Sequence, residues 1–253
     1  MNRRRVQTIA TLGVISFGVA ACALPADDPD PPLLACNRPS VDELESTIDD
    51  ATAWLGRSQQ PDGTYWYEYD RAADEFSDDY NDVRHAGTTM SLYQVAAAYP
   101  DDDRGPEALR LADEALGYIA LGSYEADDRV AFVGQSSRAD LGSTALAVAG
   151  LVHRRLATGD ERFDDVLASM GRFMQSLMRD DGGMWGWASR ATLEPIEGQT
   201  STFYTGEAFW AFGLLANQFP DDGWDDSARA VGTYIATERD REEEIENPPL
   251  ADQ

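Results

Sequence analysis

The sequence contains no lysine, so all 20 of its basic residues are arginines, set against 46 aspartates and glutamates. The resulting net charge of −26 would repel nucleic acids, which argues against a nucleic-acid-binding function. Salt screens the mutual repulsion of carboxylates, so the composition favours adaptation to saline surroundings, a halophilic character. GC-rich coding is the alternative explanation for the missing lysine, but it does not account for the surplus of acid.

Cysteine and histidine are also scarce, with two of each. Two cysteines cannot form a disulfide framework or a cysteine-based zinc site, and two histidines limit metal chemistry further. The sequence shows no phosphate-binding glycine loop, no Gly-x-Ser-x-Gly and no cluster of metal ligands, so we expect neither a metal nor a cofactor. Aromatic residues are plentiful, and a chain that is 43% hydrophobic can form a folded core.

The amino terminus carries an export pattern. The positive segment Asn2–Arg5 precedes an apolar run from Val6 to Ala21, which is short for a transmembrane helix. The run ends in Val19-Ala20-Ala21-Cys22, which resembles the lipobox of bacterial lipoproteins. The resemblance implies a signal peptide at residues 1–21 and acyl chains (palmitate among them) on Cys22, which would anchor the protein in the membrane on the extracytoplasmic side of the cell envelope. An ordinary signal peptide with an incidental cysteine is the alternative.

Residues 22–39 are rich in proline and aspartate, which predicts an extended tether between the lipid and a folded domain. With Cys22 lipidated, Cys36 would have no partner in the chain. We assign Cys36 no chemistry.

Residues 40–253 show apolar side chains at helical spacing, which predicts an all-α domain. Counted along the chain, the second, fourth and sixth predicted helices are rich in small residues and share a glycine at one position (Gly87, Gly142 and Gly206). The helices before and after them are amphipathic. This repeat of about 60 residues predicts helical hairpins stacked side by side, with small residues letting the inner helices approach closely. The predicted helices cover residues 41–55, 82–98, 106–119, 140–158, 163–177, 205–218 and 224–239, and residues 130–133 predict a short strand.

Three segments carry a family resemblance: residues 59–65, 181–185 and 204–208. Together with the alternating helices, they resemble the α/α-toroid proteins, which include six-hairpin glycosidases, sugar epimerases, squalene cyclases and prenyltransferases. The first segment nearly matches the cyclase repeat Gln-x-x-Asp-Gly-x-Trp, with Tyr65 in place of Trp. The chain lacks an Asp-x-Asp-Asp motif and a set of prenyltransferase zinc ligands, which disfavours isoprenoid chemistry.

The resemblance implies a closed ring of six hairpins, about 360 residues at this period. This sequence supplies about three and a half hairpins, so we expect an incomplete toroid and interpret the chain as truncated at its C-terminus.

In such a ring, the loops that lead into the inner helices gather at one end. Here those loops carry aromatic residues, whose rings can stack on sugars, and polar residues, which can bind hydroxyl groups. This composition predicts an oligosaccharide or polysaccharide ligand. The candidate substrate-binding residues are Tyr65, Trp66, Glu68, Asp70, Arg84, Arg138, Asp140, Trp185, Trp187 and Tyr204.

Glycosidic cleavage needs one protonated and one ionised carboxyl, and Glu207 with Asp82 is the predicted pair, with Glu68 or Asp70 as other partners for Glu207. His85 is the candidate general base of a sugar epimerase or lyase. Alternatively, Glu207 is an acid favoured by the helix dipole, and His85 is a helix-entry residue bonded to the backbone. We expect Trp54, Trp210 and Trp224 in the core.

The sequence therefore predicts a lipid-anchored α/α-toroid protein that acts on carbohydrate, glycoside hydrolase-like if it is an enzyme. A non-catalytic lipoprotein that binds glycans or another envelope protein is the alternative. A terpene-cyclase-like or prenyltransferase-like function comes third.

Overall fold

The computed structural model describes residues 39–243. The chain divides into two units, Met1–Ser40 and Val41–Gln253, and the fold below is that of the second unit. The predicted signal peptide, Cys22, nearly all of the predicted tether and Cys36 lie outside the described residues, as do residues 244–253.

The described unit is mainly helical, and its helix boundaries follow the predicted ones closely. The helices α2, α4, α5 and α6 begin and end within one residue of their predicted limits, and α3 begins at Arg104, which places Pro106 in its first turn. The predicted last helix divides into α7 and the short α8. The helices are α1 (Val41–Ser58), α2 (Asp82–Ala98), α3 (Arg104–Gly122), α4 (Leu141–Thr158), α5 (Asp164–Ser176), α6 (Tyr204–Gln218), α7 (Trp224–Thr237) and α8 (Arg239–Glu242).

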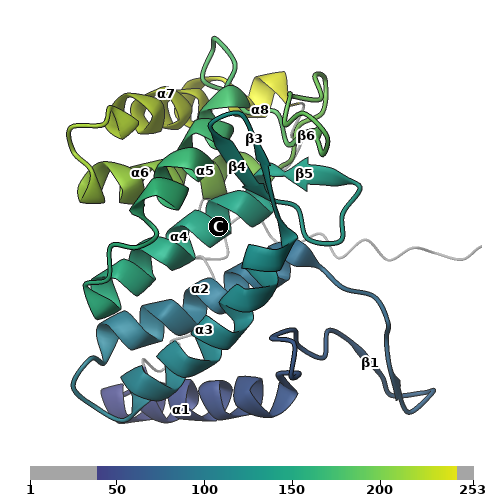
Figure 1. Ribbon diagram of the computed structural model, residues 1–253, viewed down its shortest axis with the longest axis vertical. Coiled ribbons are helices and arrows are strands. Elements are labelled where there is room, and N and C mark those ends of the chain that lie inside the picture. The colour runs from purple at the N-terminus through teal and green to yellow at the C-terminus, as the bar shows by residue number, and fades with distance from the viewer. Residues whose placement is uncertain (1–38, 244–253) are drawn as a thin grey trace, which may run out of the picture. The chain divides into compact units, whose positions relative to one another are not determined.

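The even-numbered helices form an inner layer, and the odd-numbered helices cover it. Helix α2 packs against α4 and α4 against α6, while α3 packs on α2, α5 on α4 and α7 on α6. Successive hairpins therefore lie side by side from α1 to α7 (Figure 1). This arrangement confirms the predicted stack of helical hairpins.

Small residues bring the inner helices close together, as the repeat predicts. A side chain on Gly87 of α2 would touch Leu146 of α4 at 3.5 Å, and one on Gly150 would lie 3.3 Å from the Cα of Met90. On the other face of α4, Gly142 lies against Tyr204 and Glu207 of α6. The contact at Gly87 would still admit a methyl group at ordinary contact distance, the one at Gly150 would be tight, and a side chain at Gly142 would overlap its neighbours on α6.

Two Asp-Gly turns, at Asp62–Gly63 and Asp181–Gly182, follow α1 and α5. In each turn an aspartate Oδ1 accepts a hydrogen bond from the backbone N–H two residues later, at 3.0 and 2.9 Å. Both glycines have positive φ (85° and 88°), and a side chain on either would collide with a backbone carbonyl of α3 or α7. The Asp-Gly sequence that carries the family resemblance thus serves to pack each loop against the next outer helix.

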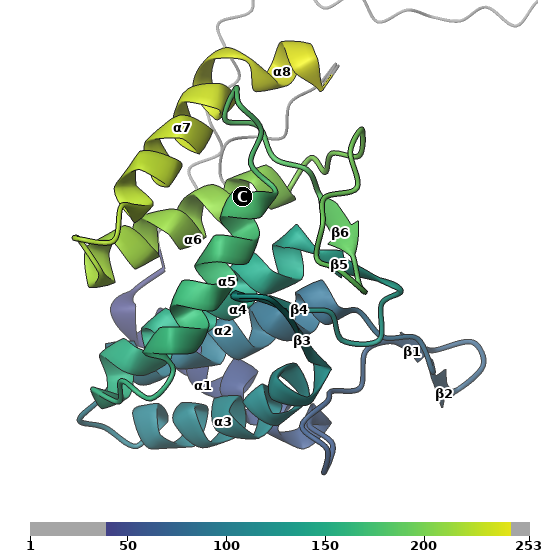
Figure 2. The same cartoon turned by 45° about the horizontal axis from the view of Figure 1, so that its top comes forward.

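Three short antiparallel strand pairs lie on one side of the helices (Figure 2). The third pair joins the segment before α4 to the loop after α5 and sets Asp140 opposite Trp187. The strands are β1 (Tyr69–Asp70) with β2 (Glu75–Phe76), β3 (Ser123–Ala126) with β4 (Arg129–Phe132), and β5 (Arg138–Asp140) with β6 (Trp187–Ser189). Only β4 was predicted, because two- to four-residue strands leave little alternation in the sequence.

Of the three tryptophans predicted in the core, the structure confirms one and corrects two. Trp210 is only partly buried and lines a cavity. Trp224 is 4% exposed and packs between α5 and α6, as expected. Trp54 is 56% exposed, so its predicted core position is wrong. Val41 and Leu44, in the apolar stripe of α1, are also exposed to solvent. Among the described helices, α1 packs mainly against α3.

Within residues 39–243, no helix combines the length and apolar character that crossing a membrane requires.

Candidate functional site

The N-terminal ends of the inner helices carry a row of three cavities. We name them the aromatic cavity (about 140 Å³), the aspartate cavity (about 270 Å³) and the glutamate cavity (about 570 Å³). The first two adjoin, because Tyr80 and Asn81 line both, and Tyr204 lines the second one turn before Glu207 in the third.

The residues that line each cavity come from α1 and from the segments that enter the inner helices. The aromatic cavity is lined by Trp54, Leu55, Tyr65, Trp66, Tyr67, Tyr80, Asn81, Arg84, His85 and Thr88. The aspartate cavity is lined by Tyr80, Asn81, Asp82, Val83, Gln135, Ser136, Asp140 and Tyr204. The glutamate cavity is lined by Leu146, Gly206, Glu207 and Trp210.

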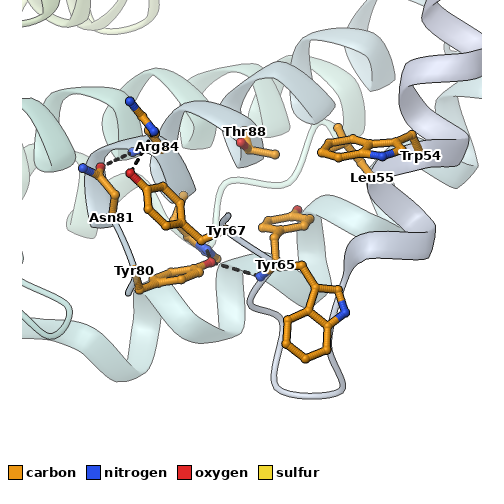
Figure 3. A pocket seen from close by; sticks show the side chains of 10 residues that line it. Trp54, Leu55, Tyr65, Tyr67, Tyr80, Asn81, Arg84 and Thr88 are labelled. Carbon is orange, nitrogen blue, oxygen red and sulfur yellow. Dashed lines mark hydrogen bonds between the residues drawn. The ribbon is translucent and has the colours of Figure 1, made fainter. Parts of the chain in front are cut away.

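At one end of the aromatic cavity, Arg84 and Tyr67 meet (Figure 3). The Arg84 Nη1 donates a hydrogen bond of 2.8 Å to the Tyr67 hydroxyl, and the guanidinium carbon lies 5.3 Å from the centre of the Tyr67 ring. Asn81 caps α2, because its side chain accepts a hydrogen bond of 2.9 Å from the Arg84 backbone N–H. The cap fixes where Arg84 leaves the helix.

His85 lies at the bottom of the same cavity with 2% of its surface exposed. Its Nε2 donates to the Ala115 carbonyl at 3.0 Å, so its Nδ1 accepts from the Tyr80 hydroxyl at 2.7 Å. Burial lowers the pKa of His85. Since both ring nitrogens are engaged within the fold, proton transfer with a substrate would first require one of these bonds to break.

Asp82 is held firmly in the aspartate cavity. The Tyr118 hydroxyl donates to its Oδ1 at 2.7 Å, and the Gln135 backbone N–H donates to its Oδ2 at 3.1 Å. A side chain on Gly134, whose φ is 57°, would overlap this carboxylate. The fold therefore positions Asp82 from three segments, α2, α3 and the loop after β4.

Asp140 faces the same cavity from the start of α4. The pKa of Asp140 is raised to about 6, chiefly by burial; Arg138 opposes the rise, and the charge of Asp82 contributes to it. Arg138 itself lies over the Trp187 ring at 4.1 Å and donates to the Gln199 side chain at 2.8 Å. Asp140 thus changes its charge near neutral pH beside a second carboxylate.

Glu207 opens on the glutamate cavity from the first turn of α6. Burial raises the pKa of Glu207 to about 7. Its Oε2 is buried and has no hydrogen-bond partner among the described residues. Tyr204 lies between the acids, and burial together with the charges of Asp140 and Glu207 raises its pKa to about 12.

Other predicted site residues lie elsewhere. Glu68 and Asp70 belong to the exposed segment that forms the β1–β2 hairpin and line none of the three cavities. The Asp70 carboxylate instead accepts hydrogen bonds from backbone N–H groups of its own turn. Trp185 packs against the core and beneath Arg179. The predicted partners Glu207 and Asp82 line different cavities, with Tyr204 between them.

Sequence reasoning missed Tyr118 and misplaced Trp54. Tyr118 lies on the amphipathic helix α3, and no local pattern signals its bond to a carboxylate 36 residues away. Trp54 lines the aromatic cavity because the Asp-Gly turn after α1 folds Tyr65 and Trp66 back towards it. Among residues 39–243, no group of three or more His, Cys, Asp or Glu side chains is placed to hold a metal ion.

Neither a known protein family nor a curated protein sequence matches this chain. Solved structures do. The cellobiose 2-epimerase of Spirochaeta thermophila has a TM-score of 0.54 and 16% identity, over 79% of this chain and 56% of that protein. A sugar epimerase from a ruminal bacterium has a TM-score of 0.60 and 14% identity, over 77% and 55%. The GH76 α-mannanase of Bacteroides thetaiotaomicron has a TM-score of 0.53 and 12% identity, over 75% and 52%.

These three proteins are α/α toroids, and the chain spans about half the length of each. At such low identity the likeness concerns the fold alone. The described hairpins have the arrangement of part of such a ring, with the cavities at the N-terminal ends of its inner helices. The chain therefore has the α/α-toroid fold that its sequence predicts.

Proposed function

We propose that this protein is a carbohydrate-active enzyme of the glycoside hydrolase type, which cleaves its substrate along the aspartate and glutamate cavities. The observation that carries the proposal is the placement of Asp82, Asp140 and Glu207 at the N-terminal ends of three adjacent inner helices, with the Glu207 Oε2 buried and without a described partner. Acid–base cleavage of a glycosidic bond needs such carboxyls in different environments.

The different environments of these carboxyl groups give them different roles in the proposed reaction. With a pKa of about 7, Glu207 is protonated in about half of the molecules at neutral pH and can donate its proton to the glycosidic oxygen as the bond breaks. Asp82, whose two oxygens accept hydrogen bonds from Tyr118 and Gln135, is the carboxylate on the other side of the sugar, which either removes a proton from the water that attacks the anomeric carbon or forms the bond to that carbon itself before water releases the sugar. Asp140 beside it is the second candidate for that role.

The similar structures support a carbohydrate substrate, since their names describe sugar epimerases and a mannanase. The epimerase alternative, with His85 as the base, has weaker support in the geometry, because both His85 nitrogens are bonded to Tyr80 and Ala115. A non-catalytic glycan-binding role is favoured by one feature, the aromatic cavity, whose lining includes no carboxylate.

Anchoring by lipid on Cys22, on the extracytoplasmic side of the envelope, belongs to the same proposal and rests on the sequence Val19–Cys22. If it is right, Cys22→Ser should move the protein from the membrane fraction to the soluble fraction. Mass spectrometry of the wild type should find an acylated Cys22.

The experiment that tests the enzyme is a cleavage assay in molar KCl with neutral and acidic oligosaccharides, scored for binding and for new reducing ends. Glu207→Gln should keep binding and lose cleavage by about 10²-fold or more. Glu197→Gln, which removes an exposed carboxyl that lines none of the three cavities, is the matched control. Binding without turnover by the wild type would favour the binding protein, and absence of any binding would remove the carbohydrate proposal.

A further inference from the structure

Arg84 gives the aromatic cavity a positive charge, which is unusual on a chain this acidic. Among the residues that line the aromatic cavity it is the one with a full charge, because His85 is buried with a lowered pKa and the lining includes no Asp or Glu. The chain as a whole carries a net charge of −26. A positively charged cavity on so acidic a protein is a specific local arrangement, since the average field of the surface repels anions.

Arg84 also differs from most of the other described arginines in having no acidic partner. Most arginines within residues 39–243 have a carboxylate oxygen within 4.0 Å, as expected where acids outnumber bases. Arg84 has none among the described residues, although Asp82 and Asp140 line the adjoining cavity. The described arginines without such a partner are Arg57, Arg71, Arg84, Arg138 and Arg190.

Three side chains with unused hydrogen-bond donors meet at this end of the cavity (Figure 3). Arg84 uses Nη1 on the Tyr67 hydroxyl, and its Nη2 and Nε have no described partner. The Tyr67 hydroxyl accepts that bond, so its own proton is free to be donated. The Asn81 side-chain oxygen accepts a hydrogen bond from the Arg84 backbone N–H, and the two N–H groups of the Asn81 side-chain amide have no described partner.

We propose that the aromatic cavity binds a sugar unit that carries a carboxylate, held by Arg84, Tyr67 and Asn81, and that the protein acts on acidic oligosaccharides. Arginine presents paired N–H groups that match the two oxygens of a carboxylate. The rings of Trp54, Tyr65 and Trp66 offer apolar faces for the sugar itself. The cavity measures about 140 Å³, below the roughly 300–1,000 Å³ of pockets that bury a drug-sized ligand, so it has room for no more than one sugar unit.

The position of the cavity gives this unit a role in specificity. Tyr80 and Asn81 separate it from the aspartate cavity, so the acidic unit would lie next to the bond that Asp82 and Glu207 are proposed to cleave. The inference rests on the proposed function in so far as it assumes a carbohydrate ligand.

The test compares trigalacturonate with its fully methyl-esterified form, which differs only in charge and ester groups. Trp54 and Trp66 line the cavity, so tryptophan fluorescence can report binding. The wild type should bind the free acid about tenfold or more tighter than the ester, and Arg84→Gln should weaken binding of the acid about ten- to a hundredfold. Arg71→Gln, an exposed arginine outside the cavities and also without a described carboxylate partner, should change neither affinity by more than about twofold.

The outcomes separate the two proposals. Equal affinity of the wild type for acid and ester, or a preference that survives in Arg84→Gln, would overturn the acidic-sugar assignment and leave the carbohydrate proposal standing. Failure to bind these sugars and a panel of neutral oligosaccharides as well would overturn both. Arg84→Lys, which keeps the charge but not the paired donors, should recover part of the preference.

Discussion

Glu207 of α6 lies directly against Gly142 of α4, and any side chain at position 142 would overlap its Oε2. The glycine that repeats along the inner helices therefore has a second use at this position. It lets α4 and α6 pack, and it leaves the volume that the buried carboxyl occupies. The spacing of the inner helices and the environment of the proposed acid depend on the same residue.

Gly142→Ala should displace Glu207 and Tyr204 and lower the free energy of unfolding by about 1–3 kcal/mol, the usual effect of overpacking. Gly213→Ala, within α6 and with open space around it, should instead raise stability by about 0.5–1 kcal/mol, because alanine is the better helix former. Urea denaturation of both variants checks this pair. Equal effects of the two substitutions would contradict the packing that we describe.

The pH dependence of stability should reveal the buried Glu207. Because burial raises its pKa from 4.5 to about 7, the folded protein binds a proton more tightly than the unfolded chain, and this contribution is lost as pH rises from about 4.5 to 7. Each pKa unit is worth about 1.4 kcal/mol of unfolding free energy. Because Gln cannot ionise, the unfolding free energy of Glu207→Gln relative to the wild type should rise by up to roughly 3 kcal/mol between pH 4 and pH 8. Thermal unfolding across that range measures the gain, and exposed Glu197→Gln should show no comparable trend.

Tyr80→Phe should lower the free energy of unfolding by about 2 kcal/mol. The Tyr80 hydroxyl bonds to the His85 Nδ1 and accepts from the Tyr65 backbone N–H at 3.1 Å, so its removal leaves two groups unpaired in a largely buried site. Tyr124→Phe, whose hydroxyl makes only a 3.5 Å contact at the surface, is the control. A Tyr80→Phe variant as stable as the wild type would show that this network does not hold His85.

Arg154 should contribute far more stability than Arg110. Arg154 has a side chain 5% exposed and joins α4 to Asp113 of α3 at 2.9 Å, whereas Arg110 pairs with its own helix at the surface. Arg154→Met leaves Asp113 without that partner and should cost about 2 kcal/mol, less than for a fully buried partner because Asp113 is partly exposed. Arg110→Met should stay within about 0.5 kcal/mol. Denaturation midpoints of the two variants decide it.

Salt should stabilise the folded protein strongly if the acidic composition reflects a halophilic character. A net charge of −26 repels itself, and the repulsion falls as the screening length shortens from about 10 Å at 0.1 M salt to about 3 Å at 1 M. We expect the melting temperature to rise steadily between 0.1 and 2 M KCl. Sucrose of equal osmolality serves as the uncharged control, and a rise no greater in KCl than in sucrose would argue against charge screening as the cause.

The helices could be predicted because their signals are local. Helix α2 covers the predicted residues 82–98, and the structure shows why: Asn81 caps its start and Pro100 follows its end, and both act within one turn of the residues they affect. The alternation of small-residue and amphipathic helices gave the layers for the same reason.

The candidate site could be predicted only in part. The loops that would carry it were identified, and Asp82, Asp140, Tyr204 and Glu207 do line neighbouring cavities there. Glu68 and Asp70, from the same predicted loops, do not, because they lie on the segment of an exposed hairpin whose strands are too short to predict.

The amino-acid sequence by itself determined the helices, their order, the glycines between them and the acidic surface, because each depends on residues close together in the chain or on composition. Only the tertiary structure decided which groups meet. Tyr118 reaches Asp82 across 36 residues, Asp140 pairs with Trp187 through the β5–β6 register, and Trp54 opens into a cavity instead of the core. Helical spacing tells which side a residue faces, but whether that side is buried, charged or open depends on what the rest of the chain brings against it.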